Sequence, residues 1–154
     1  MKNQMVKMLV VVAALLAAMS AWALTDKQPE GTERRNERQW SAVAQEDLDV
    51  VSDKLSLATP LGAGDVAVNL SIEGVPGFSR LPRGTTLTFA GGAVLMVEEY
   101  NPPCSRMSHF VAEQYPTCSG EPLAGTDFIE ASKFCRGLVG VVEVPGIVSV
   151  GDSV

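Results

Sequence analysis

The chain has 154 residues, a formal net charge of −6 at pH 7 and a hydrophobic fraction of 46%. This length suits one domain rather than two, and the apolar fraction is sufficient for a hydrophobic core. Acidic residues outnumber basic ones by 18 to 12, and no basic stripe with interleaved aromatic residues occurs, which argues against a nucleic-acid partner.

The first 23 residues have the pattern of a secretory signal peptide. Lys2 and Lys7 form a basic start, residues 8–18 are an unbroken apolar run, and Ala21-Trp22-Ala23 is a small-x-small cleavage site. We therefore expect residues 1–23 to be a signal peptide and the protein to be exported, either periplasmic or secreted. The alternative is an uncleaved segment that anchors the protein in a membrane, although a spanning helix needs about 20 apolar residues.

Residues 24–37 are polar and predict a linker, so we place the folded domain at residues 38–154. A first strand is expected at residues 39–43. An amphipathic helix is expected at residues 45–55, where Leu48, Val51 and Leu55 share one face. Apolar residues alternate strictly from Val66 to Ile72, which predicts a half-buried strand.

The second half of the chain predicts two hairpins and two helices. The first hairpin turns at Gly91-Gly92 and the last at Pro145-Gly146. A short helix is expected at residues 108–114, and another begins at Asp127 with Glu130 in a capping box and ends at Gly137. The fold class is therefore α+β, mainly β: an antiparallel β-barrel-like domain with two or three short peripheral helices.

The segment from Asn101 to Met107 carries the most informative residues. Pro102 and Pro103 stiffen the backbone directly before Cys104, because each proline fixes its own φ. Arg106 follows two residues later, and a nearby cation favours the reactive thiolate. The sequence thus predicts either a reactive thiol on a stiff loop or a small buried cysteine.

Three cysteines remain after the expected cleavage, and an odd number leaves one unpaired thiol in a disulfide-permitting compartment. Either Cys118 pairs with Cys135 and Cys104 stays free, or all three are reduced. His109 would complete a set of three cysteines and one histidine for zinc, but the irregular spacing disfavours such a site.

Several segments together resemble the MOSC domain, the C-terminal domain family of molybdenum cofactor sulfurases. The similarity begins near Arg34 and continues to the end of the chain. The segments are Arg38–Val43, Asn69–Gly74, the Cys104 loop Pro103–Met107 with the helix after it, Arg136–Val142, and Gly146–Val154.

This resemblance implies a β-barrel in which a cysteine carries sulfur or ligates molybdenum, with a pterin phosphate nearby. Carried over to this chain, Cys104 is the metal-ligating or sulfur-carrying residue, and Arg106 assists it catalytically. Arg38, Asn69 and Arg106 are the expected cofactor-binding residues.

The implied cofactor is the molybdenum cofactor, molybdopterin, and the implied activity is that of a cofactor-dependent oxidoreductase or a sulfur-transfer protein. The implied partners are a sulfur donor or a molybdoenzyme acceptor. Pyridoxal phosphate binding is associated with the family as a whole, and it is not carried over to any residue of this chain.

One departure from the family pattern supports a different function. The family usually has a Gly-Asp-x-His-type segment before the first strand, and here Glu30-Gly31-Thr32 is followed by neither Asp nor His. The alternative is a non-enzymatic binding or remnant domain that keeps the MOSC fold without its cofactor.

Export gives the first testable prediction. Mature protein purified from native host cells should begin at Leu24, because cleavage is expected after Ala23. N-terminal sequencing checks this, and soluble cytoplasmic protein with an intact Met1 would contradict it.

Overall fold

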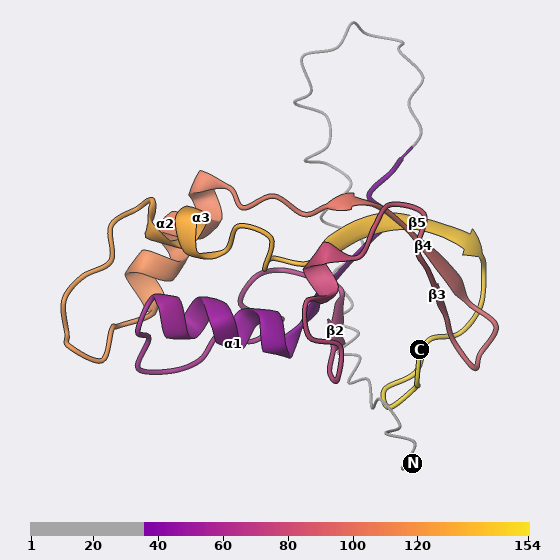
Figure 1. Ribbon diagram of the computed structural model, residues 1–154, viewed down its shortest axis with the longest axis horizontal. Coiled ribbons are helices and arrows are strands. Elements are labelled where there is room, and N and C mark those ends of the chain that lie inside the picture. The colour runs from indigo at the N-terminus through magenta and orange to yellow at the C-terminus, as the bar shows by residue number, and fades with distance from the viewer. Residues whose placement is uncertain (1–35) are drawn as a thin grey trace, which may run out of the picture.

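The computed structural model describes residues 36–154, so the expected signal peptide and nearly all of the linker lie outside the described residues. Five strands form one mixed sheet in the order β2-β1-β5-β4-β3, which curves into a half-barrel. Three helices lie at the other end of the elongated molecule, so that the sheet and the helices form two halves (Figure 1).

The expected α+β, mainly β, barrel-like fold is confirmed. Three of the four strand pairings are antiparallel, and β1 with β2 is the parallel exception. Between residues 36 and 154 no helix combines the length and the apolar character needed to cross a membrane. The strands are β1 (Trp40–Ala44), β2 (Leu70–Ile72), β3 (Thr86–Thr88), β4 (Val94–Tyr100) and β5 (Leu138–Val144); the helices are α1 (Gln45–Lys54), α2 (Ser105–Gln114), α3 (Asp127–Ala131) and a 3-10 helix at Phe78–Arg80.

Each half has its own hydrophobic core, and β1 contributes to both. Trp40, Ala42 and Ala44 pack into the sheet core, whereas Val43 packs into the helical core, because successive side chains of a strand point to opposite faces. Leu48 and Val51 of α1 are fully buried in the helical core, as their helical spacing predicts.

Only the second half of the strand expected at residues 66–72 is a strand. Residues 63–67 form turns, and Ala67 has a φ of 54°, in the left-handed region that interrupts an extended strand. Val66 is nevertheless fully buried in the helical core. Its apolar side chain therefore packs from a loop and only imitates the alternation of a strand.

The expected boundaries of both later helices are wrong. α2 begins at Ser105, three residues earlier than expected, so that Cys104 is its N-cap residue. α3 ends at Ala131, well before Gly137, and its N-cap is Thr126. Asp127 forms no capping box, because its Oδ2 accepts a hydrogen bond from the backbone of Ala124 at 2.8 Å.

The second strand of the final hairpin, expected after the turn at Pro145-Gly146, is also wrong. Ile147 does not pair with β5; it bridges to Gly91 in the turn of the β3–β4 hairpin. A side chain at Gly91 would overlap the carbonyl of Ile147, so this close approach depends on glycine. The C-terminal segment therefore packs across the far end of the sheet.

A chain of hydrogen bonds links the two halves. Asp47 of α1 accepts from the backbone N–H groups of Gly77 at 3.2 Å and of Ser79 at 2.8 Å. The Ser79 hydroxyl accepts from the backbone N–H of Gly137 at 2.8 Å, and the Gly137 carbonyl accepts from Asn101 at 3.0 Å. The start of β5 is thereby fixed to α1 and to the segment that precedes α2.

We expect Asp47→Asn to lower the free energy of unfolding by about 1–3 kcal/mol. The amide NH2 group that replaces one carboxylate oxygen cannot accept a hydrogen bond, so one of the two backbone N–H groups loses its acceptor. Urea denaturation measures this change. Asp49→Asn is the matched control on the exposed face of α1, and a shift within about 0.5 kcal/mol is expected for it. Equal losses for both variants would contradict the role of Asp47.

Gly137 gives a second stability prediction. Its φ is 89°, and an added Cβ would overlap the carbonyl of Ala42, so Gly137→Ala should be strongly destabilising. Gly120 has a φ of 77° with open space around it, and Gly120→Ala should cost only the left-handed backbone penalty of about 1–2 kcal/mol. A smaller loss for Gly137→Ala than for Gly120→Ala in urea denaturation would refute the steric argument.

Candidate functional site

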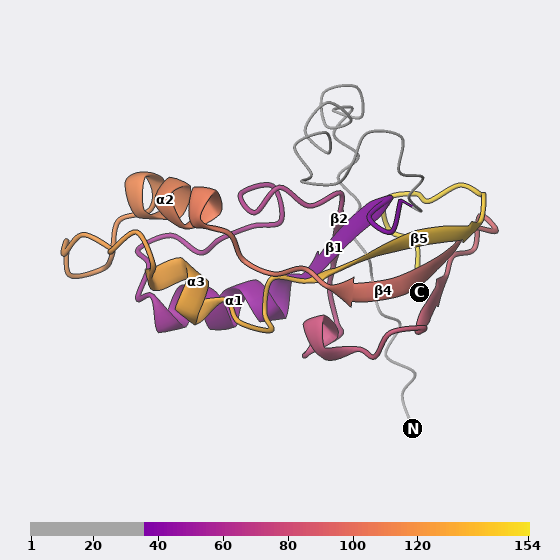
Figure 2. The ribbon, with the colours of Figure 1, turned by 90° about the horizontal axis from the view of Figure 1, so that it is seen from above.

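The thiol of Cys104 is exposed at the N-terminus of α2. The segment that joins β4 to α2 crosses from the sheet half to the helical half (Figure 2). Cys104 has extended backbone angles, φ −124° and ψ 158°, and its carbonyl accepts the first helical hydrogen bond from Ser108. Its side chain makes no capping hydrogen bond. The thiol is therefore free to react, and the N-terminus of a ten-residue helix stabilises negative charge there.

A buried arginine lies under the Cys104 loop. Arg136 is only 8% exposed, and its Nη1 donates to the carbonyl of Pro102 at 3.2 Å, two residues before Cys104. Its Nη2 donates to the carbonyl of Val66 at 3.3 Å. Arg136 therefore holds together the Cys104 loop, the loop before β2 and the start of β5.

The charge of Arg136 is buried without a carboxylate partner among residues 36–154. Burial lowers the pKa of its guanidinium, while the neighbouring Cys104 opposes that shift and the neighbouring Arg38 adds to it. Within the described part of the chain its Nε–H has no hydrogen-bond partner. A buried unpaired donor costs about 1–3 kcal/mol, so an acceptor placed against this Nε–H would be stabilising.

A second buried donor without a partner lies one helical turn from Cys104. Ser108 has no exposed surface, and its hydroxyl makes no hydrogen bond within residues 36–154. Cys104 is the N-cap residue, with extended backbone angles and an exposed thiol, so helical spacing does not direct the Ser108 hydroxyl toward that thiol. Arg136 is therefore the buried polar group that the structure connects to the Cys104 loop.

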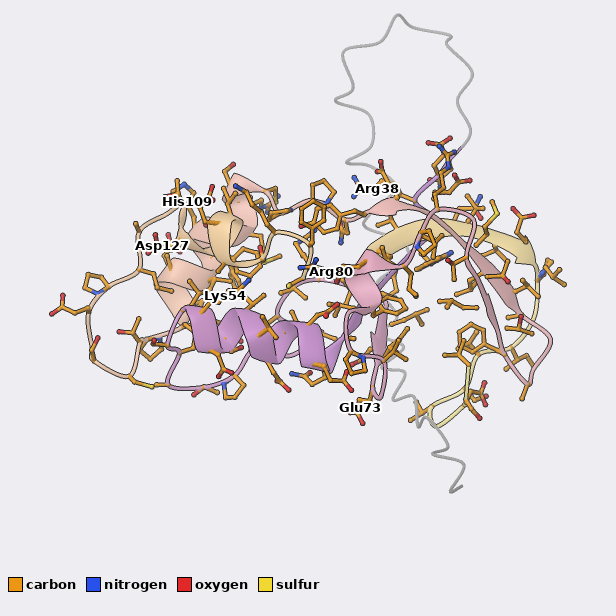
Figure 3. All side chains as sticks on the ribbon, viewed as in Figure 1. Arg38, Lys54, Glu73, Arg80, His109 and Asp127 are labelled. Carbon is orange, nitrogen blue, oxygen red and sulfur yellow. The ribbon has the colours of Figure 1, made fainter. Side chains whose placement is uncertain are left out.

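Arg38 lies beside this site. Its Nη2 donates to Oδ1 of Asn101 at 2.8 Å, and its Nε is 3.9 Å from Oε1 of Glu99. Figure 3 shows Arg38 near the segment that leads from β4 toward α2. Asn101 thus connects the Arg38 side chain to the same segment that carries Cys104, and the half-exposed guanidinium can reach an anion there.

Asn69, expected to bind the cofactor, also joins two strands through its side-chain oxygen. Its Oδ1 accepts hydrogen bonds from the backbone N–H and the hydroxyl of Ser41, at 3.0 and 3.1 Å. The Asn69 backbone N–H in turn donates to the Ser41 carbonyl at 3.0 Å. These contacts join the beginning of β2 to β1, so the side-chain carbonyl of Asn69 is structural and its amide nitrogen is the group left for a ligand.

Arg106 is exposed in the first turn of α2, two residues after Cys104. A cation at a helix N-terminus opposes the helix dipole at a cost of about 0.3–1 kcal/mol. An anion bound at this helix end would offset that cost. Its position is therefore consistent with the expected role beside Cys104.

The other two cysteines are not joined to each other. All three are free thiols; Cys118 is exposed and Cys135 is buried, so the Cys118–Cys135 disulfide offered as one alternative is wrong. Burial raises the pKa of the Cys135 thiol, which disfavours its reactive thiolate. In the described part of the chain no three potential metal ligands from His, Cys, Asp and Glu come together.

A solvent-open groove between α1 and α3 is not part of the Cys104 site. It has a volume of about 410 Å³. It is lined by Lys54, Leu55, Leu123, Asp127, Glu130 and Ala131. The convergent polar groups at Cys104, rather than this groove, identify the candidate site.

The structure therefore brings Cys104, Arg38 and Arg136 together, and Arg136 is the residue that sequence reasoning missed as a functional group. The feature of the sequence that could have indicated Arg136 is its position at the start of the Arg136–Val142 segment, which resembles the MOSC family. Chemically, an exposed thiol with cationic donors behind it can bind an anionic ligand or carry a covalently attached anionic sulfur.

Comparison with known proteins supports this assignment of the motifs. A family model described as the MOSC domain matches residues 29–154. The Bacillus subtilis (strain 168) protein YuaD, named for a proposed role in metal-sulfur cluster biosynthesis, is 31% identical over 124 residues. That match covers 80% of this chain and 62% of YuaD, so the chain spans less than two thirds of this relative.

The crystal structure of the YuaD protein from Bacillus subtilis has the same fold. It matches with a TM-score of 0.72 and 26% sequence identity, over 94% of this chain and 73% of that chain. The sequence motifs, the half-barrel and both comparisons agree, and the chain belongs to the MOSC domain family.

Proposed function

We propose that this MOSC domain handles sulfur or the molybdenum cofactor, and that Cys104 is the residue that carries sulfur or ligates molybdenum. One observation carries the proposal: the thiol of Cys104 is exposed at a helix N-terminus, on a loop held by a buried arginine that has no carboxylate partner among residues 36–154. A thiolate is a soft ligand and a strong nucleophile, and the surrounding donors suit a group of negative charge.

The described residues fit an anionic cofactor such as molybdopterin. Cys104 offers the sulfur ligand, Arg38 and Arg106 offer exposed guanidinium groups for a phosphate, and Asn69 keeps a free amide nitrogen. Guanidinium groups match oxyanions because they donate in a planar fork. When bound, the cofactor would supply redox chemistry at molybdenum, and the chain would supply binding and orientation.

The relative's name favours sulfur handling over redox chemistry. YuaD is named for a proposed role in metal-sulfur cluster biosynthesis, and a sulfur-carrier role is compatible with that name. We therefore place the sulfur-carrier role first, with a sulfur donor upstream and a molybdoenzyme acceptor downstream. The expected export of the chain remains part of the proposal and would place these partners outside the cytoplasm.

Substitution of each cysteine tests this proposal. Cys104→Ser should abolish persulfide loading and molybdenum retention, while its free energy of unfolding should change by no more than about 0.5 kcal/mol, since Cys104 is exposed. A persulfide assay and elemental analysis for molybdenum on the purified protein measure the two functions. Circular dichroism establishes that the variant is folded.

Cys118→Ser is the matched control, because Cys118 is also an exposed free thiol. It should keep full loading. If Cys104→Ser retains loading, the assignment of Cys104 is wrong. If the wild-type chain acquires neither sulfur nor molybdenum, the domain is a binding or remnant domain that keeps only the fold.

A further inference from the structure

The charge balance around Cys104 is unusual for a chain that is acidic as a whole. Arg136 carries a positive charge at 8% exposure, and its hydrogen bonds within residues 36–154 go only to two neutral carbonyl oxygens, those of Pro102 and Val66. A buried cation without a counter-ion is costly. An anion placed on Cys104 would supply that counter-ion.

A purely structural role does not explain all of these contacts. Donation to two neutral carbonyl groups requires no positive charge, yet Arg136 buries a delocalised charge and leaves its Nε–H without a hydrogen-bond partner within residues 36–154. The loop already has two prolines that limit its freedom. The retained charge and the unsatisfied donor both point to a negatively charged ligand.

We propose that Arg136 is a positioning residue that makes the Cys104 site selective for anionic sulfur donors. It acts through the Pro102 carbonyl, which fixes the loop, and through its charge, which attracts an anion to the thiol. The substrate class is a sulfane-sulfur compound with a negative charge, such as a persulfide anion on a donor. This inference rests on the sulfur-carrier role proposed above.

A nearby cation favours the transfer step itself. The Cys104 thiolate attacks the terminal sulfur of the donor persulfide anion, and a new S–S bond forms on Cys104 as the S–S bond of the donor breaks. The donor sulfur leaves as a thiolate with the electron pair, and no electron or proton is gained or lost. Two negative charges meet in this step, so a nearby guanidinium lowers their repulsion.

Two alkylating reagents test the electrostatic part of the proposal. Iodoacetate is an anion and iodoacetamide is neutral, and both react with the same thiolate. The ratio of their rates therefore reports the local charge and is independent of how much thiolate is present. In the wild-type chain this ratio should be about five-fold higher at Cys104 than at the exposed Cys118, the factor expected for a Coulomb attraction near 1 kcal/mol. Peptide mass spectrometry resolves the two sites.

Variants of Arg136 test whether this residue causes the higher iodoacetate-to-iodoacetamide rate ratio at Cys104. Arg136→Gln should lower the ratio at Cys104 by about five-fold and leave the ratio at Cys118 unchanged. Arg136→Lys should keep most of the ratio, since it keeps the charge, and should lose loop order. Lys133→Gln is the control, because it removes one equal charge from an exposed residue that pairs with Glu130.

The proposal is overturned if the wild-type ratios at Cys104 and Cys118 are equal, a result that requires no variant to fold. It is also overturned if Arg106→Gln abolishes the difference while Arg136→Gln leaves it intact. Failure of persulfide loading with the ratios as expected would refute the sulfur-carrier role and leave Arg136 as the source of an anion-selective thiol.

Discussion

The two peptide groups of Gly137 connect the sheet half, the helical half and the candidate site. The N–H of Gly137 donates to Ser79, which is held by Asp47 of α1, and its carbonyl accepts from Asn101 at the start of the Cys104 segment. No side chain fits there, because the backbone of β1 approaches too closely. The position of the Cys104 loop relative to the sheet therefore depends on a residue that has no side chain.

Arg136 lies next to this glycine, and burial of its guanidinium costs free energy that the surrounding structure must offset. A guanidinium loses hydration on burial, and two neutral carbonyl groups return only part of that energy. The rigid surroundings keep the charge in place: a five-stranded sheet on one side and a packed helical core on the other. Cys104, by contrast, sits on the surface, where a partner can reach it.

Local pattern predicted the elements that have a repeated period. The helix at α1, the Gly91-Gly92 hairpin and the β5 strand follow from side-chain spacing and turn residues, and the Cys104 loop follows from its prolines and its family motif. Two predictions were wrong for physical reasons: the strand expected to begin at Val66 and the final hairpin strand expected to include Ile147. Val66 is apolar because it packs against helices from a loop, and Ile147 bridges to Gly91 because of tertiary packing. Arg136 was missed because burial of a charge has no local sequence signature.

The sheet ends on both sides in short strands, and this limits how it can associate with other chains. β2 and β3 have three residues each, so each outer edge presents few free backbone N–H and C=O groups. The first and last residues of β3, Thr86 and Thr88, are polar and exposed. Strand addition from a second molecule gains little at such edges. The half-barrel can therefore remain open along its rim, with the Cys104 thiol exposed, without offering a template for aggregation.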